Sequence, residues 1–475
     1  MSLRRKTLIY FSSTVFNSAL SFLVLPLATK VLTPADYGKL GALNAVANAF
    51  GAFCCASIGY VLSAKYLAAT HTERREIVSS ALVSVICLSL LGMGIMVIAI
   101  KSLGSLIADS VAFTSVEIAI SCIGIFSTSI WAVASDVFIL SGQAGRFSVA
   151  VITQGLIQMV MLLVSLYWWS LGGISLFIGL AAGNITLIII SIILLGNNIG
   201  PHAQYALVKE YFKTTFIASS ANFTELLYPW LERWLLTGYI GLSSVGLYTH
   251  AQTYSNILFT VVKSAGRSIW PITLNEAREE NPMFPHTRRL WGVWQMLITA
   301  VAVCFAAIGD VFISILTHGK FIDAHLYATA MLVILVAKHT GRAENGLLYS
   351  QGDVKILSSL NFFSSILAMI SLGILVPFFG TWGAVSSMGI QILVYRLGLL
   401  IAARSKGLRG SSEPWLIRAP VLVGATIMIK LAFTPGILGD LILIATATAA
   451  LGLVGRLEVT NAFHMLLSRR AQTTA

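Results

Sequence analysis

Charged residues are scarce in this chain: only 11% of its 475 residues are Asp, Glu, Lys or Arg, whereas soluble domains carry about 25%. Hydrophobic residues make up 57% of the sequence and gather in runs of roughly 20, the length that crosses the hydrocarbon core of a bilayer. This shortage of charge excludes a soluble globular protein. The sequence therefore predicts an all-α polytopic membrane protein.

Other absences narrow the function. The five cysteines all lie in apolar runs, without zinc-ligand spacing, so we interpret them as small buried side chains. No loop of the form GxxxxGK[ST] occurs, so a nucleotide is not the expected energy source, and no cofactor is predicted. The net charge of +12 would suit nucleic acid, but the basic residues lie in scattered short loops, and no nucleic-acid partner is predicted. We expect the function to lie within the bilayer.

The apolar runs predict about fourteen transmembrane helices. The basic opening Arg4-Arg5-Lys6 could begin a signal peptide, but the run that follows continues to about Leu32 without a clear cleavage site. We interpret it as an uncleaved first helix. The expected spans are 8–32, 38–62, 77–100, 116–140, 148–170, 172–195, 214–240, 245–272, 290–317, 326–350, 356–378, 382–404, 417–434 and 437–455.

Basic residues alternate between the two sides of this arrangement. When the loops are numbered from a cytoplasmic N-terminus, most of the 31 Lys and Arg residues fall on the cytoplasmic side. The opposite loops hold only Lys30, Lys39, Lys101 and Lys320. This asymmetry follows the positive-inside rule and predicts that both termini lie in the cytoplasm.

The two halves of the chain are weakly similar. A shift of 208 residues places Gly38 on Gly246 and Asn48 on Asn256. Two six-helix units with an even helix count must be parallel repeats, and a substrate site is expected at their interface, around a central cavity. The predicted domains are an N-terminal lobe at 1–200, a C-terminal lobe at 201–405, and two extra helices with a cytoplasmic tail at 406–475.

Two segments resemble a known family. The turn Leu32-Thr33-Pro34-Ala35-Asp36-Tyr37-Gly38, after a first helix with Phe22, Leu25 and Pro26, resembles the opening of the Wzx-type polysaccharide flippases, where a Leu-x-Pro-x-x-Tyr-Gly turn joins helices one and two. The segment from Glu232 to Tyr248 looks like that family's seventh-to-eighth helix junction, with Glu232 where the family often has Asp.

The resemblance implies the fold of the multidrug/oligosaccharidyl-lipid/polysaccharide exporter superfamily, and within it the polysaccharide transporter branch that contains O-antigen repeat-unit flippases. It implies movement of undecaprenyl-diphosphate-linked oligosaccharide units from the cytoplasmic to the periplasmic leaflet of a bacterial inner membrane. The implied partners are this lipid-linked oligosaccharide, membrane lipid, a polysaccharide polymerase and a chain-length regulator.

Basic residues inside the predicted spans are the candidate substrate ligands. A charge in mid-bilayer costs roughly 2.5 to 3.5 kcal/mol, so such residues usually face a bundle interior or a wet cavity. Guanidinium and ammonium groups supply charge-assisted hydrogen bonds to phosphate oxygens, which suits a diphosphate. Two pairs are four residues apart and so share a helix face. The predicted substrate-binding residues are Arg233, Lys263, Arg267, Lys338 and Arg342.

Two acids in the seventh span are the candidate ion-coupling residues. Glu225 and Glu232 are seven residues apart and share a face, with Pro229 between them as an expected kink. A carboxyl group beside a base can alternate between an ion pair and a protonated or sodium-bound state. The alternative is that Glu232 and Arg233 only neutralise each other. No catalytic residue or metal site is predicted.

Structural roles stay open for other polar residues. Lys338 and Arg342 could instead form an ion pair with Glu344, and Arg267 and Lys430 could extend to the membrane interface. Gly179 and Gly183 form a GxxxG pattern that predicts close helix packing. We expect the remaining concentration of polar residues, Asp310, His318, Asp323 and His325, to be a solvated loop.

The sequence thus predicts a transporter rather than an enzyme: a lipid-linked oligosaccharide flippase that works by alternating access. Its expected energy source is an ion gradient or the gradient of the cargo itself. A lipid II flippase and a cation-coupled multidrug exporter of the same fold are the alternatives. A membrane glycosyltransferase or polysaccharide polymerase is more remote, since it would need catalytic groups on a sizeable outer loop.

Overall fold

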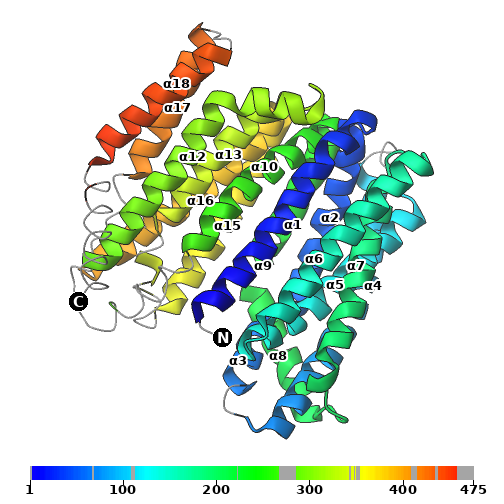
Figure 1. Ribbon diagram of the computed structural model, residues 1–475. Helices are drawn as coiled ribbons and strands as arrows, with labels where there is room; N and C mark the ends of the chain where they lie inside the picture. Colours follow the sequence, from blue (N-terminus) through cyan, green and yellow to red (C-terminus); the bar gives the residue numbers. More distant parts are fainter. Residues whose placement is uncertain are drawn as a thin grey trace. The chain divides into compact units, whose positions relative to one another are not determined.

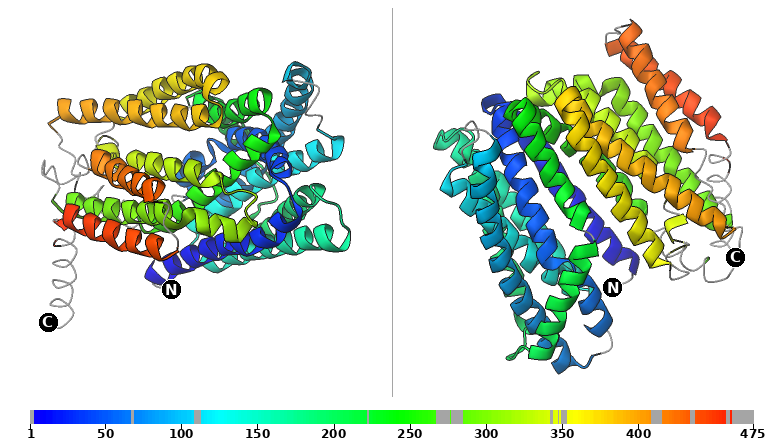
Figure 2. Two further views of the ribbon diagram at one scale, coloured as in Figure 1. Left: turned by 90° about the horizontal axis from the view of Figure 1, so that it is seen from above. Right: turned by 180° about the vertical axis from the view of Figure 1, so that it is seen from behind.

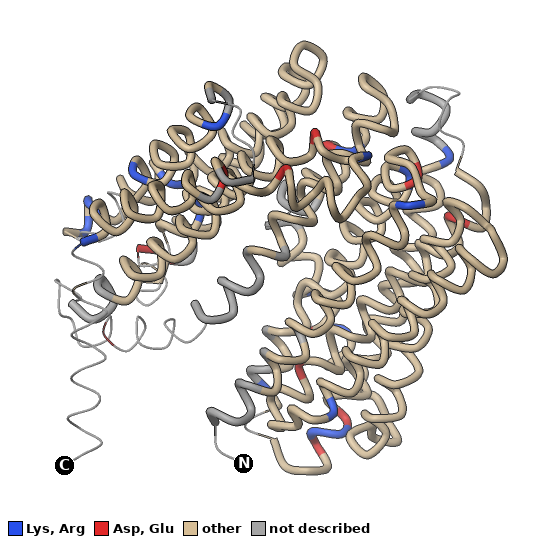
Figure 3. The backbone as a smooth tube through the Cα atoms, turned by 45° about the horizontal axis from the view of Figure 1, so that its top comes forward, with Lys and Arg blue, Asp and Glu red and all other residues tan. Residues whose placement is uncertain are grey.

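The computed structural model describes residues 3–66, 69–107, 113–221, 223–266, 276, 285–341, 344–346, 348, 353–407, 415–433, 437–456 and 460. The regular elements in this part are helices, and it contains no strand. The predicted all-α fold class is confirmed. Figure 3 shows how few charged residues lie along the described helices, as the composition requires.

The chain divides into two compact units, Met1–Leu247 and Tyr248–Ala475 (Figure 1). Helix α10 (Leu242–Gly266) contains the boundary. The first unit holds α1 (Leu3–Val31), α2 (Pro34–Cys55), α3 (Ile58–Tyr66), α4 (His71–Ile107), α5 (Ser115–Leu140), α6 (Ala144–Leu163), α7 (Ile174–Leu195), α8 (Tyr205–Ala221) and α9 (Phe223–Ile240). The second holds α12 (Pro285–Thr317), α13 (Ala324–His339), α15 (Val354–Phe379), α16 (Thr381–Ser405), α17 (Trp415–Phe433) and α18 (Ile437–Val454).

Seven helices of the described residues are long and apolar enough to cross a membrane. Three shorter apolar helices, Val15–Val31, Ala324–His339 and Ile442–Val454, accompany them. Each expected span contains a described helix, and the total of about fourteen crossings stays a prediction. The seven are His71–Lys101, Ser115–Leu140, Ala144–Trp168, Ile174–Asn198, Leu290–Thr317, Lys355–Phe379 and Thr381–Ser405.

The turn before α2 has the predicted local chemistry. The backbone N–H of Thr33 donates to Asp36 Oδ2 at 2.8 Å, and the Asp36 N–H donates to Thr33 Oγ1 at 3.4 Å, which makes a capping box. Pro34 occupies the first turn, where its missing N–H needs no partner. This turn fixes where α2 begins.

Close packing of α6 and α7 follows from glycine, as the GxxxG pattern predicts. A Cβ at Gly179 would lie 2.8 Å from Leu162 Cβ, and a Cβ at Gly183 would lie 2.8 Å from Gln158 Cβ. Both distances are shorter than real Cβ contacts, so any larger residue would force the two helices apart.

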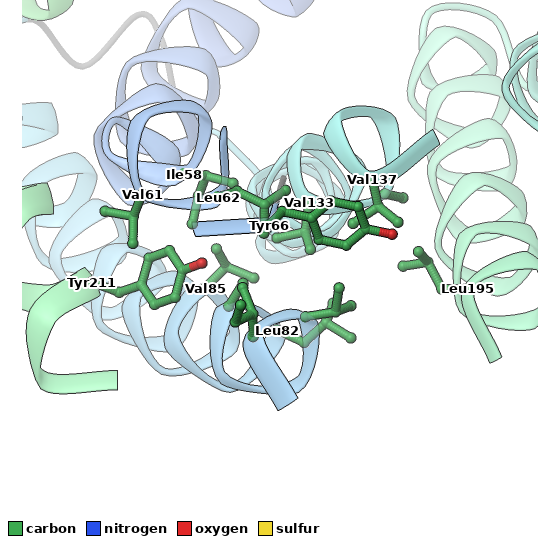
Figure 4. Close-up of a cluster of buried hydrophobic side chains, with 14 of the residues drawn as sticks. Ile58, Val61, Leu62, Tyr66, Leu82, Val85, Val133, Val137, Leu195 and Tyr211 are labelled. Carbon is green, nitrogen blue, oxygen red and sulfur yellow. The ribbon is translucent and has the colours of Figure 1, made fainter. Parts of the chain in front are cut away.

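The sequence predicts that the span after α7 begins at residue 214. In the structure a helix begins earlier, within the polar stretch that follows α7. Helix α8 begins at Tyr205 and buries Leu207 and Tyr211 against α3, α4 and α5. Its Thr215 hydroxyl lies 2.5 Å from the Ser57 hydroxyl, at the break between α2 and α3. In Figure 4 the ring of Tyr211 lies beside Val61 and Val85.

In the second unit, α12 packs against α13, α17 and α18, while α15 and α16 pack along each other (Figure 2). The two helices predicted as a C-terminal addition are therefore attached to α12. The lobe boundaries predicted from the repeat stay a prediction.

Candidate functional site

The predicted Glu232 and Arg233 form a buried ion pair on α9. Their side chains are 2% and 6% exposed, and an Arg233 Nη1–H donates to Glu232 Oε2. Helix α9 packs on α2, and Trp230 lies against a buried apolar cluster that includes Val46 and Leu88. In these apolar surroundings either charge alone would be costly to bury, so the two side chains are expected to stay paired. The structure thus has the pairing that the sequence left open as an alternative.

The other predicted ligands are only partly placed. Lys338 lies in the last turn of α13 and is exposed. The side chains of Glu225 and Lys263, and the residues Arg267 and Arg342, lie outside the described part of the chain. The roles assigned to all seven residues stay predictions.

Arg396 of α16 is a buried cation to which the sequence assigned no role. Its Nη2 lies 3.8 Å from Glu344 Oε1, and both side chains have no exposed surface. Its Nε–H donates to Thr340 Oγ1 at 2.9 Å. Gly341 leaves space for this side chain, since a Cβ there would lie 2.5 Å from Arg396 Nη1. Within the described residues, Glu344 is therefore the ion-pair partner of Arg396 rather than of Lys338.

The polar residues near the α12–α13 connection are not all in a solvated loop. Asp310 belongs to α12, and His325 is only 6% exposed, whereas His318 and Asp323 are exposed as expected. The expectation failed for Asp310 because it lies within α12, inside the span expected at 290–317. It failed for His325 because Gly309 leaves space for the imidazole ring.

Lys430, which could extend to the membrane interface, contacts a neighbouring helix in the structure. Its side chain is 13% exposed and its ammonium donates to Asp310 Oδ1 and to the carbonyl of Ala307. Oxygen atoms on the neighbouring helix α12 therefore compensate this positive charge.

The first turns of α2 and α10 meet in a reciprocal contact. A Cβ at Gly38 would lie 1.9 Å from the carbonyl oxygen of Leu242, and a Cβ at Gly246 would lie 1.8 Å from that of Pro34. The shift of 208 residues that relates Gly38 to Gly246 also relates Pro34 to Leu242. Two copies of one helix end would make this contact across a local two-fold axis. The internal repeat itself stays a prediction.

Comparison with solved structures places this fold among membrane transporters. An inward-facing multidrug resistance MATE family transporter of the MOP superfamily superposes with a TM-score of 0.65 at 14% identity, covering 84% of this chain and 98% of the other. The lipid II flippase MurJ in an inward closed conformation gives a TM-score of 0.65 at 14% identity, covering 97% and 100%. The eukaryotic MATE transporter AtDTX14 gives 0.52 at 13% identity, covering 88% and 98%. At these identities the likeness establishes the fold alone.

No curated protein shows a significant match to the chain. A family model, described as polysaccharide biosynthesis protein, matches residues 3–273, more than half of the sequence. The chain is therefore a multi-pass membrane protein that belongs to the polysaccharide biosynthesis protein family.

Proposed function

We propose that this protein is a flippase of the Wzx branch, which moves undecaprenyl-diphosphate-linked oligosaccharide repeat units across the bacterial inner membrane during surface polysaccharide synthesis. The observation that carries the proposal is the family match over residues 3–273 combined with the fold of a membrane transporter. The described residues form helices with short connections, which fits transport of a precursor better than its enzymatic assembly.

Cationic side chains support an anionic cargo. The predicted spans contain Lys263, Arg267, Lys338 and Arg342 in addition to Arg233, and Lys338 is exposed. Such groups bind phosphate oxygens through charge-assisted hydrogen bonds. We infer that the diphosphate contacts these bases while the two lobes, 1–200 and 201–405, alternate in access.

The energy source in this proposal is an ion gradient. Glu225 and Glu232 on α9 are the candidate coupling acids. Arrival of the diphosphate would draw Arg233 away from Glu232 and leave that carboxylate free to take a proton or sodium ion. The buried ion pair described above is the starting state of such an exchange.

A lipid II flippase is the second candidate, because the match to MurJ spans 97% of the chain. The two functions use the same carrier lipid class and differ in the sugar. Deletion of the gene separates them: loss of surface polysaccharide with viable cells supports the Wzx proposal, and a block in cell-wall synthesis supports lipid II. If the protein were a cation-coupled drug exporter, deletion of the gene would give neither result and would make the cells more sensitive to drugs.

The membrane topology can be tested separately. Both termini are proposed to lie in the cytoplasm, so reporter fusions after Lys65, Arg146 and Lys355 should report cytoplasm, and fusions at Lys101 and Lys320 should report periplasm. A cytoplasmic Lys320 would contradict the proposed lobes. A polysaccharide polymerase and a chain-length regulator are the proposed protein partners.

Lys338→Gln is expected to reduce export severalfold without loss of stability, because the side chain is exposed and its removal leaves no buried group without a partner. Lys338→Arg should retain most export, since the charge is kept. Lys355→Gln, at a predicted cytoplasmic loop, is the matched control and should export normally. Export is measured as surface polysaccharide in a deletion strain. Normal export by Lys338→Gln would remove this residue from the site.

A further inference from the structure

Five side-chain amides lie within the apolar helices of the first unit. They are Asn17 on α1, Asn48 on α2, Gln154 and Gln158 on α6, and Asn184 on α7. Asn48 is exposed and the other four are half-buried. None of the five side chains makes a hydrogen bond with another residue in the described part of the chain. In the second unit, by contrast, the Gln391 Nε2–H of α16 donates to Ser365 Oγ of α15 at 3.0 Å.

Glycine contacts link these amides from helix to helix. Asn17 Oδ1 would lie 2.0 Å from a Cβ at Gly155, which stands between the two glutamines of α6. Gln158 in turn covers Gly183 of α7, the residue before Asn184. The contacts therefore place amides of α1, α6 and α7 at one level.

This level is close to the middle of the membrane. Gln158 and Asn184 lie near the centres of two of the candidate spans described above. Leu43 of α2 and Phe177 of α7 belong to one buried cluster, and the two helices also adjoin at their first turns, so they run in the same direction. Asn48 and Asn184 follow these two residues by five and seven positions and thus have a similar depth. We call the five side chains the amide layer.

Helix packing does not account for the amide layer. An amide that joins two membrane helices does so through a hydrogen bond to a polar group of the facing helix. Asn17 and Gln158 face glycines instead, and Asn184 Nδ2 would lie 3.5 Å from a Cβ at Gly124 of α5. A glycine has no side chain to donate or accept, and its backbone groups within a helix are already paired.

The amide layer needs hydrogen-bond partners from outside the chain. An amide without a partner is costly in hydrocarbon, because nothing there forms hydrogen bonds. Each of the five side chains keeps exposed surface, and each can both donate and accept. The layer is also uncharged, since residues 7–29, 40–64 and 147–208 contain no Asp, Glu, Lys or Arg. A neutral, hydroxyl-rich ligand matches these groups, whereas a phosphate is matched by bases.

We propose that the amide layer binds sugar hydroxyl groups of the cargo and so gives the protein a preference for a glycosylated lipid. Sugar hydroxyls donate and accept hydrogen bonds and carry no charge, as the layer requires. This role rests on the proposed function, because it assigns a site to the oligosaccharide of the same lipid-linked cargo.

Thermal unfolding separates this role from helix packing. Asn48→Leu and Gln154→Met keep the side-chain size and remove no hydrogen bond within the described residues, so both variants should melt at or above the temperature of the parent protein. Gln391→Met is the matched control, an amide that does join two helices. It leaves the buried Ser365 hydroxyl without its donor and should lower the melting temperature. An equal loss of stability in all three variants would overturn the proposal.

The second measurement is the affinity for two lipids that differ only in the sugar. The probes are the lipid-linked oligosaccharide isolated from the deletion strain and undecaprenyl diphosphate without sugar, each titrated into purified full-length protein in detergent. We expect the parent protein to bind the glycosylated lipid about tenfold more tightly, the value of one or two hydrogen bonds. The double variant Asn48→Leu/Gln154→Met should lose most of this preference and keep its affinity for undecaprenyl diphosphate. Gln391→Met should keep the preference.

The outcomes distinguish the sugar site from the proposed function. If the parent protein bound both lipids equally, or if the double variant retained the preference, the amide layer would not be a sugar site and the flippase proposal would stand. A double variant that lost affinity for both lipids to the same extent would also overturn the sugar site, since the amides would then act on the fold as a whole. Binding of neither lipid by the well-folded parent protein would contradict the proposed function, and the sugar site with it.

Discussion

Replacing Glu232 with Gln is expected to lower the free energy of unfolding by about 3–5 kcal/mol, because it removes the carboxylate that the buried Arg233 guanidinium contacts. The loss of stability should exceed that of most single substitutions. Water cannot reach the buried guanidinium of Arg233 to replace the carboxylate as its partner. The double variant Glu232→Gln/Arg233→Gln should recover most of the lost stability. Thermal unfolding in detergent measures all three proteins.

The control for this change is an exposed pair in the same unit. Lys65 and Glu210 lie 2.6 Å apart with side chains 36% and 43% exposed. Glu210→Gln should therefore lower stability by less than about 1 kcal/mol. If Glu232→Gln lowered stability no more than Glu210→Gln, the ion pair on α9 would not lie in low-dielectric surroundings. If the double variant also transported normally with an imposed ion gradient, Glu232 would not be a coupling residue.

Gly38→Ala and Gly246→Ala are each expected to destabilise the protein by about 1–3 kcal/mol through overpacking. A methyl group at either position would lie within 2 Å of a backbone carbonyl oxygen of the facing helix end, so the ends of α2 and α10 must separate. Because the two contacts are reciprocal, the two substitutions should lower stability by similar amounts. The double variant should lose less stability than the sum of the two single losses. Export should fall as well, if these helix ends must meet during transport.

Gly94→Ala provides the opposite expectation. This glycine lies within α4, is exposed, and nothing lies within 4 Å of a Cβ placed there. Alanine should stabilise that helix by about 0.5–1 kcal/mol, since it has the higher helix propensity. Thermal unfolding compares the variants. A Gly38→Ala protein as stable as Gly94→Ala would show that α2 and α10 do not meet in this way.

Features encoded by neighbouring residues could be predicted from the sequence. Hydrophobic length gave the helical class and the approximate spans, and the capping box of Thr33 and Asp36 depends only on residues three apart. The packing role of Gly179 and Gly183 could be predicted for the same reason, because close approach requires only that a side chain is missing.

Partners from distant helices could not be predicted. Lys430 and Asp310 are 120 residues apart, and a long side chain can reach the interface or a neighbouring helix with no difference in local sequence. The pairing of Arg396 with Glu344 depends likewise on which face of α16 meets the preceding helices. Helix α8 was detectable in part, since Leu207, Tyr211, Thr215 and Ser219 repeat every four residues, but Lys209 and Lys213 interrupt the apolar run.

The most direct test of the proposed function is flipping of the cargo by the purified protein. Proteoliposomes would contain an undecaprenyl-diphosphate-linked oligosaccharide with a tagged sugar, and a membrane-impermeant glycosidase would cleave the tags that face outward. In vesicles without protein, the glycosidase should cleave only the tags in the outer leaflet. In vesicles with the protein, it should cleave nearly all tags, because cargo from the inner leaflet reaches the outer one. The Glu232→Gln/Arg233→Gln and Lys338→Gln proteins should be slower than the parent. Cleavage confined to the outer-leaflet pool in the presence of well-folded parent protein, under imposed proton and sodium gradients alike, would contradict a flippase for this cargo.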